Sequence, residues 1–165
     1  MSGSVAGFSH FTLLLVQALR EQFSKVRVFA FVERSDEVTH LFEPGAELSG
    51  VMSRVLREAN LTEFDGHSDY GNALGGFAEQ WGEAITSKTS LLILGDGRTN
   101  YRDPNLRILG RLASVARHTH WLNPEPCRQW GSGDSAALRY AEVVPMHECR
   151  TVGQLTDVVE GLLPV

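Results

Sequence analysis

SLLILG (residues 90–95) is an almost unbroken apolar run with polar residues on both sides. A short apolar run of this kind is typical of a strand that is buried on both faces of a parallel sheet. In open α/β sheets, ligand-binding loops lie beyond the carboxyl ends of such strands. The run therefore predicts a core strand, and the loop that begins at Asp96 becomes a candidate site.

Helical and strand patterns alternate on both sides of this run. Apolar residues at three- and four-residue spacing predict helices, and β-branched or aromatic runs predict strands. The expected helices are 8–23, 46–59, 71–86, 106–117 and a last one at 151–163 with Thr151 as its N-cap. The expected strands are 26–32 and 37–42, joined as an antiparallel hairpin, then 90–95, 118–124 and a short one within 141–148. This order predicts a doubly wound α/β fold, with a mostly parallel sheet and one antiparallel edge strand.

The composition is that of an ordinary globular domain. A chain of 165 residues without an internal repeat or linker is expected to form one domain, residues 1–165. The net charge of -5, without any run of Lys or Arg, argues against nucleic acid as a partner. No apolar stretch approaches the roughly 20 residues that a membrane span needs. Cys127 and Cys149 form neither a disulfide framework nor a zinc motif, and we expect a cytoplasmic protein.

Three segments carry oxygen-bearing side chains that suit a hard cation. They contain Ser2 with Ser4, Ser68 within GHSDYG, and Asp96 directly after the apolar run. Magnesium prefers oxygen ligands in octahedral geometry and commonly keeps several waters. Each segment also has a simpler explanation when it is taken alone, as a disordered leader, a turn or cap serine, and a turn aspartate. The metal site therefore depends on the three segments in combination.

That combination resembles a known family. SGS (2–4), GHSDYGNAL (66–74) and LLILGDGRTNYRDP (91–104) resemble the three metal-site loops of a von Willebrand factor type A (VWA) domain. The later segments WLNP (121–124) and GDSA (133–136) resemble, more narrowly, the CoxE-like bacterial subfamily. The resemblance covers essentially the whole chain in order. It implies a VWA/Rossmann-like fold with a metal-ion-dependent adhesion site (MIDAS), in which Mg²⁺ or Mn²⁺ is held by Ser2, Ser4, Ser68 and Asp96.

The resemblance departs from the family pattern at its beginning. The pattern D-x-S-x-S would place its first Asp one residue before Met1, and the strand that carries it before that. We therefore expect a shortened chain that lacks the first central strand and, without this carboxylate, binds the metal more weakly. Ser68 stands where the family has Thr and keeps the hydroxyl group. Asp69, the next residue, is a candidate for a side chain that contacts the metal ligands and not the metal itself.

The resemblance implies a noncatalytic protein-interaction domain. The bound metal would keep one coordination position open for a carboxylate of a protein partner. CoxE-like proteins imply a MoxR-type AAA ATPase as that partner and a client metalloenzyme, such as a carbon monoxide dehydrogenase, in whose maturation they act. Two alternatives stay open: a metal-free interaction module or inactive fragment, and a small α/β nucleotide-binding protein or enzyme.

Other motifs give weaker signals. GSGDSA (131–136) fits G-x-G-x-x-A, yet it does not directly follow a strand, as a dinucleotide site requires. The Gly/Ser loop at the start of the chain could instead present backbone N–H groups to a phosphate. His118 and His120 would share one strand face and could bind a metal. Without a third ligand in view, a solvated or hydrogen-bonded pair is the simpler interpretation.

Overall fold

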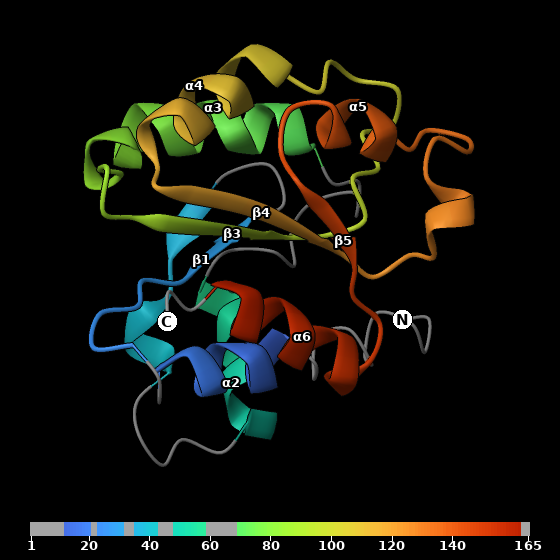
Figure 1. Cartoon of the computed structure of the whole chain (residues 1–165). Helices are drawn as coiled ribbons and strands as arrows, with labels where there is room; N and C mark the ends of the chain where they lie inside the picture. Colours follow the sequence, from blue (N-terminus) through green and yellow to red (C-terminus); the bar gives the residue numbers. More distant parts are fainter. Residues whose placement is uncertain (1–11, 21–22, 32–34, 43–47, 59–68, 163–165) are drawn as a thin grey trace. The chain divides into compact units, whose positions relative to one another are not determined.

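The computed structural model describes residues 12–20, 23–31, 35–42, 48–58 and 69–162 (Figure 1). The chain forms two compact units, Met1–Gly66 and His67–Val165. The expectation of one domain over residues 1–165 stays a prediction. None of the described helices is both long and apolar enough to cross a bilayer.

The first unit combines a pair of strands with helices. Residues 12–20 are helical. Strands β1 (Phe29–Phe31) and β2 (Ser35–Glu37) pair antiparallel, and they are followed by the 3₁₀ helix η1 (Thr39–Leu41) and by α2 (Leu48–Glu58). A cluster of buried apolar side chains forms the core: Leu13, Val38, Leu41, Val51 and Val55. The predicted antiparallel pairing and the predicted helices of this unit are confirmed in the described residues.

The second strand of the hairpin, predicted at 37–42, is wrong in its position. Val38 N still donates to Val28 O (2.8 Å), but Val28 N donates to Thr39 Oγ1 (2.8 Å) rather than to a backbone carbonyl. A side-chain oxygen that replaces a backbone acceptor ends strand pairing. The chain therefore turns into η1, which places Leu41 in the core with no exposed surface.

The second unit is built on a parallel sheet. Its strands are β3 (Ser90–Leu94), β4 (His118–Asn123) and β5 (Met146–Glu148), in the order β3-β4-β5. Both pairings are parallel, as the apolar run of β3 predicts. Together with the antiparallel pair of the first unit, this sheet confirms a mixed α/β fold of the VWA/Rossmann-like type.

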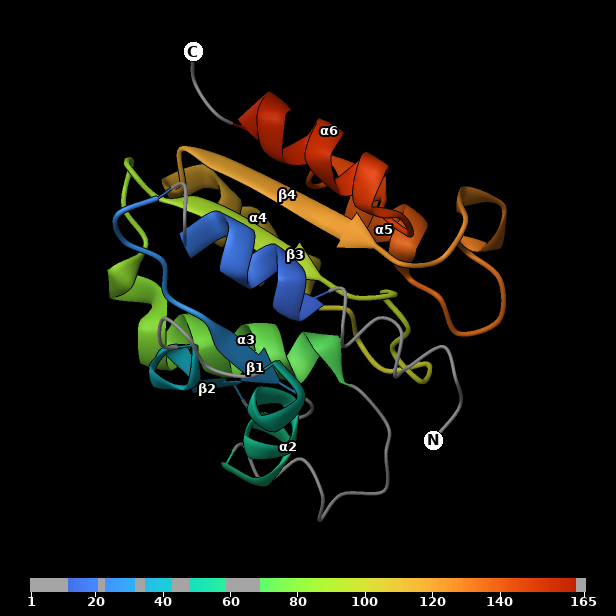
Figure 2. The same cartoon turned by 90° about the horizontal axis from the view of Figure 1, so that it is seen from below.

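Helices cover both faces of the parallel sheet. One face carries α3 (Tyr70–Trp81), α4 (Leu106–Val115) and α5 (Ala137–Ala141), and the other carries α6 (Val152–Leu162) (Figures 1 and 2). The short 3₁₀ helices η2 (Gly82–Ala84) and η3 (Cys127–Gln129) lie in connections. The sequence predicts α3, α4 and α6 but misses α5, which is only five residues long.

The most deeply buried strand is β4 rather than β3. Trp121, Leu122 and Asn123 are 0–1% exposed, whereas Ser90 at the start of β3 is exposed and Leu92 is half-buried. β4 has a hydrogen-bonded neighbour on each side, so it forms the centre of the described parallel sheet. Its sequence, HTHWLN, hides this because four of its six residues are polar.

Helix α6 begins with a reciprocal cap, as the choice of Thr151 as N-cap predicts. Gln154 N donates to Thr151 Oγ1 (3.2 Å), and Thr151 N donates to Gln154 Oε1 (3.2 Å). This capping box gives partners to two backbone N–H groups that the helix itself leaves without one.

Replacing Thr151 with alanine should lower the free energy of unfolding by about 1 kcal/mol, because one N–H group loses its acceptor. Urea unfolding of the whole chain measures this. Thr156→Ala is the matched control, since Thr156 lies on the same helix and is also exposed. Equal losses in both variants would contradict the cap as the cause.

Candidate metal centre

The structure describes one of the four predicted metal ligands. Asp96 is separated from the end of β3 by Gly95 alone, and it lies at the carboxyl edge of the parallel sheet, where ligand sites of open α/β folds occur. Ser2, Ser4 and Ser68 lie outside the described residues. Their part in a metal site therefore stays a prediction, and so does the cation itself.

The two carboxylate oxygens of Asp96 have different surroundings. Oδ1 accepts hydrogen bonds from Arg98 N (2.9 Å) and from the Tyr70 hydroxyl (3.2 Å). The first of these forms a turn, which Gly97 completes with a φ of 73°. Among the described residues, Oδ2 has no hydrogen-bond partner. Burial raises the pKa of the Asp96 carboxyl, so a cation at Oδ2 would offset a desolvation cost that the turn alone leaves.

Tyr70 connects the second predicted site segment to Asp96. It is the first residue of α3, stands two residues after Ser68 in the chain, and is buried. Burial, with the nearby Asp96 charge, raises the pKa of Tyr70 well above its usual value, so its hydroxyl stays a neutral donor. Gly95 has to lack a side chain, because a Cβ there would overlap the Tyr70 hydroxyl. The structure thus brings the residue that begins α3 directly to the carboxylate.

Asp69 takes a structural role in the described contacts. It is the N-cap of α3, and its Oδ1 accepts from Asn72 N at 2.9 Å. Its Oδ2 lies 3.0 Å from Nη1 of Arg102. Both oxygens are therefore engaged in fixing the start of α3 and in tying the loop after β3 to that helix.

Two buried side chains of β4 hold the backbone around Asp96. Trp121 Nε1 donates to Gly95 O (2.7 Å), and Asn123 Nδ2 donates to Asp96 O (3.0 Å). The Trp121 ring stacks on Tyr140, with centroids 4.4 Å apart, and its centroid lies 5.5 Å from that of Tyr70. The central strand thereby fixes both the peptide that carries Asp96 and the tyrosine that holds its carboxylate.

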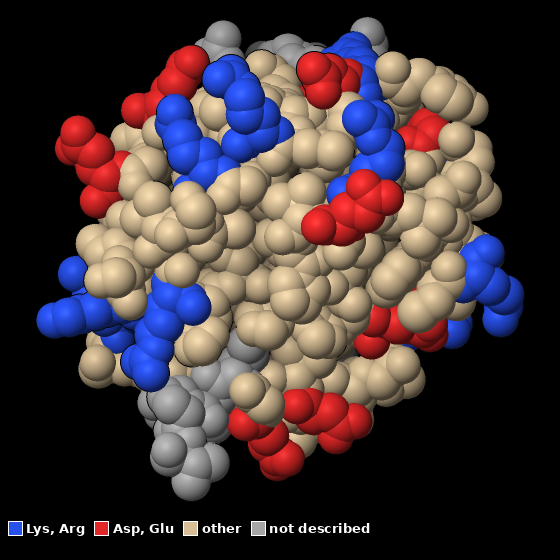
Figure 3. Space-filling view, turned by 45° about the horizontal axis from the view of Figure 1, so that its top comes forward, with Lys and Arg blue, Asp and Glu red and all other residues tan. Residues whose placement is uncertain are grey.

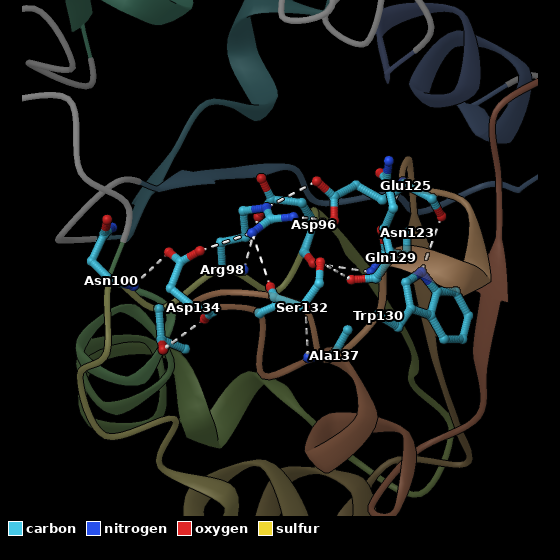
Figure 4. Close-up of polar contacts among 12 residues, drawn as sticks. Asp96, Arg98, Asn100, Asn123, Glu125, Gln129, Trp130, Ser132, Asp134 and Ala137 are labelled. Atoms are coloured by element: carbon cyan, nitrogen blue, oxygen red, sulfur yellow. Dashed lines mark hydrogen bonds and ion pairs between the residues drawn. The ribbon is translucent and has the colours of Figure 1, made fainter.

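Arg98 joins two loops at the same edge of the sheet (Figure 4). Its guanidinium binds both oxygens of Glu125, at 2.9 and 3.0 Å, and Asp134 Oδ1 at 2.8 Å. Asp134 Oδ2 accepts in turn from Asn100 N (3.1 Å). The sequence analysis misses this cluster. Asp134 lies in the GDSA motif that carries the family resemblance, and this was the only signal for it.

The loop held by this cluster has an unusual backbone. Asn100 and Tyr101 both adopt the left-handed conformation, with φ of 51° and 62°, which is strained for residues other than glycine. The contacts of Asp134 with Thr99 and Asn100 hold the loop in this form. Tyr101, which lies in this loop, is 84% exposed. A strained loop that displays an aromatic side chain is a candidate contact for a partner.

Several backbone N–H groups in and next to the GSGDSA segment (131–136) already have acceptors. Ser135 N donates to Ser132 O, Ala136 N to Gly97 O, and Ala137 N to Ser135 Oγ. A phosphate would need such N–H groups to be free, and the Asp134 carboxylate among them would repel it. These contacts give no support to a nucleotide site in this segment.

Charged side chains form separate small groups of both signs around an uncharged area on the face drawn in Figure 3. A nucleic-acid interface requires a basic patch or stripe. This view shows none on the described residues of that face, and the expectation that the chain binds no nucleic acid stays a prediction.

The structure adds a third histidine to the pair on β4. His120 and Leu122 alternate with Trp121 along the strand, and His147 of β5 is the register partner of Leu122. His120 Nδ1 and His147 Nε2 lie 3.0 Å apart. Burial and the neighbouring His147 and His118 lower the pKa of His120, which favours its neutral form. The sequence analysis misses His147 because it lies 27 residues from His120.

The fold is a doubly wound α/β domain with a carboxylate, Asp96, at the carboxyl edge of its parallel sheet. A family model described as "VWA domain containing CoxE-like protein" matches residues 1–158. The chain belongs to this family, and it is an interaction domain of the VWA type. No curated protein and no solved structure matches the chain.

Proposed function

We propose that the chain is a noncatalytic, metal-dependent interaction domain of the MIDAS type. Mg²⁺, or Mn²⁺ in its place, would be held by Ser2, Ser4, Ser68 and Asp96. The observation that best supports this is the half-buried Asp96 carboxylate at the edge of the sheet, whose Oδ2 has no hydrogen-bond partner among the described residues. Carboxylate and hydroxyl oxygens are the ligands that these hard cations prefer.

The chain's own residues position the ligand set. Tyr70 and the Arg98 amide fix Oδ1 of Asp96, so Oδ2 keeps a defined direction. The bound cation would supply positive charge and an open coordination position for a carboxylate of the partner. Affinity for the partner would then depend on the metal and fall when the metal is removed.

Membership of the CoxE-like family favours a particular setting for this interaction. We propose a MoxR-type AAA ATPase as the protein partner and a client metalloenzyme whose maturation the two serve in the cytoplasm. Tyr101 would contact the partner beside the metal, because exposed aromatic side chains often carry much of the binding energy of an interface.

Titration of the whole chain with Mg²⁺ or Mn²⁺ tests the metal site. We expect saturable binding of one ion that is lost in Asp96→Ala, because the variant removes the carboxylate ligand. Asp157→Ala is the matched control, since this aspartate is exposed on α6, and it should bind the ion as the unchanged protein does.

The alternatives give different results in the same titration. If neither the unchanged protein nor Asp96→Ala binds the ion, the chain is a metal-free module and the proposal is wrong. Nucleotide binding that persists in metal-free buffer would favour the α/β nucleotide-binding protein instead. Circular dichroism of each variant shows whether a loss of binding reflects a loss of fold.

A further inference from the structure

A group of histidine side chains lies on the opposite face of the sheet from α5. Trp121 points toward α5, where it stacks on Tyr140. Side chains alternate between the two faces of a strand, so His118 and His120 point to the other face. His147 reaches the same face from β5, and its ring centroid lies 5.2 Å from that of His120. Three imidazoles from two adjacent strands therefore share one surface.

We propose that His120 and His147 chelate a transition-metal ion such as Zn²⁺, with His118 or water completing its coordination. The two facing nitrogens, Nδ1 of His120 and Nε2 of His147, are 3.0 Å apart. Two nitrogens bound to one tetrahedral zinc at its usual bond length are about 3.3 Å apart. The two nitrogens would have to separate by only a few tenths of an ångström and both rings would have to turn toward the ion. The proton between them would move to the other nitrogen of its own ring, so that both facing nitrogens offer a lone pair.

The arrangement is a two-imidazole pair and not a complete cage. Within the described segments, no group of three or more His, Cys, Asp or Glu side chains is placed to hold a metal ion. The His118 ring centroid lies 6.5 Å from that of His120, and its side chain is exposed and free to reorient. We expect His118 to strengthen binding, and His120 and His147 to be essential for it.

The chemistry of this pair separates it from the site at Asp96. Imidazole nitrogens bind zinc, nickel and copper, whereas Mg²⁺ selects oxygen ligands. The proposed ion therefore binds at a second place with a second specificity. It does not depend on the proposed MIDAS function, and either can fail without the other.

Calorimetric titration of the whole chain with Zn²⁺, in the presence of excess Mg²⁺, tests the proposal. All proteins should carry Cys127→Ser, because an exposed thiol could bind Zn²⁺ independently of the histidines. We expect one Zn²⁺ per chain in the starting protein. Binding should weaken by more than about tenfold in His120→Gln and in His147→Gln. Removing a residue that only hydrogen-bonds a metal ligand already lowers metal affinity by about tenfold or more, and removing a ligand itself should cost at least as much. His40→Gln, a change in η1, should leave the affinity unchanged.

If a variant does not fold, NMR spectra of the histidine side chains in the protein with both residues intact still test the proposal. Substoichiometric Zn²⁺ should shift the imidazole signals of His120 and His147 together in the protein with both residues intact. If Zn²⁺ does not bind, or binds without shifting these two rings, they form only a hydrogen bond and the proposal is wrong. Unchanged affinity in folded His120→Gln and His147→Gln would overturn it equally.

Discussion

Replacing Trp121 with alanine should lower the free energy of unfolding of the second unit by about 3–5 kcal/mol, as is usual for large buried aromatic residues. Trp121 has no exposed surface, and it packs on Tyr140 and Tyr70. The change leaves a cavity in the centre of the parallel sheet and removes the donor to Gly95 O. Because Gly95 precedes Asp96, we also expect weaker Mg²⁺ binding in the fraction that stays folded. Urea unfolding followed by fluorescence, and metal titration, measure the two effects.

Trp121→Phe is the control that separates packing from the hydrogen bond. It keeps an aromatic ring on Tyr140 but leaves Gly95 O without the indole donor, a loss of about 1–3 kcal/mol. If Trp121→Ala is no more costly than Trp121→Phe, the aromatic packing around Asp96 is not what stabilises this part of the sheet.

Removal of the Arg98 side chain is expected to release the loops on both sides of the carboxyl edge. The exposed fraction of the side chains is 30% for Arg98, 21% for Glu125 and 19% for Asp134. These ion pairs are therefore less exposed than a typical surface pair and more exposed than a buried one. We therefore expect Arg98→Ala to cost about 1–3 kcal/mol, below the value for a fully buried pair. Without Arg98 the two carboxylates repel each other, and the strained loop at Asn100 loses its support.

Hydrogen exchange shows whether the loop, and not the whole unit, responds to Arg98→Ala. The Asn100 amide, which donates to Asp134 Oδ2, should exchange much faster while the β4 amides stay protected. Arg107→Ala is the matched control, since Arg107 is exposed in the first turn of α4. Unchanged exchange at Asn100 would contradict the role given to Arg98.

The parallel sheet was predictable because local patterns carried it. The run at 90–95 is apolar enough to predict a strand. The start of α6 was predictable for the same reason, because Thr151 and Gln154 form the cap within four residues. The end of the hairpin was not predictable in the same way. It depends on the Thr39 hydroxyl reaching Val28, a contact over 11 residues that no local pattern records.

In the candidate site, too, local patterns predict some residues and miss those whose contacts are distant in the sequence. Asp96 was found because a carboxylate follows directly after an apolar strand. Its partners come from elsewhere in the chain: Tyr70 lies 26 residues earlier, and Asn123 lies 27 residues later. The Arg98–Asp134 pair spans 36 residues and joins two loops whose sequences look merely polar. The packing of α3 and of the loops at the carboxyl edge of the sheet brings these residues together, and no local pattern predicts it.

Anomalous diffraction from crystals grown with Mn²⁺ tests the proposed metal site. We expect one manganese peak beside Oδ2 of Asp96, with the hydroxyl oxygens of Ser2, Ser4 and Ser68 around it. Crystals that show no peak there, and that place Ser4 and Ser68 far from Asp96, would contradict the proposed metal site and the mode of partner binding built on it.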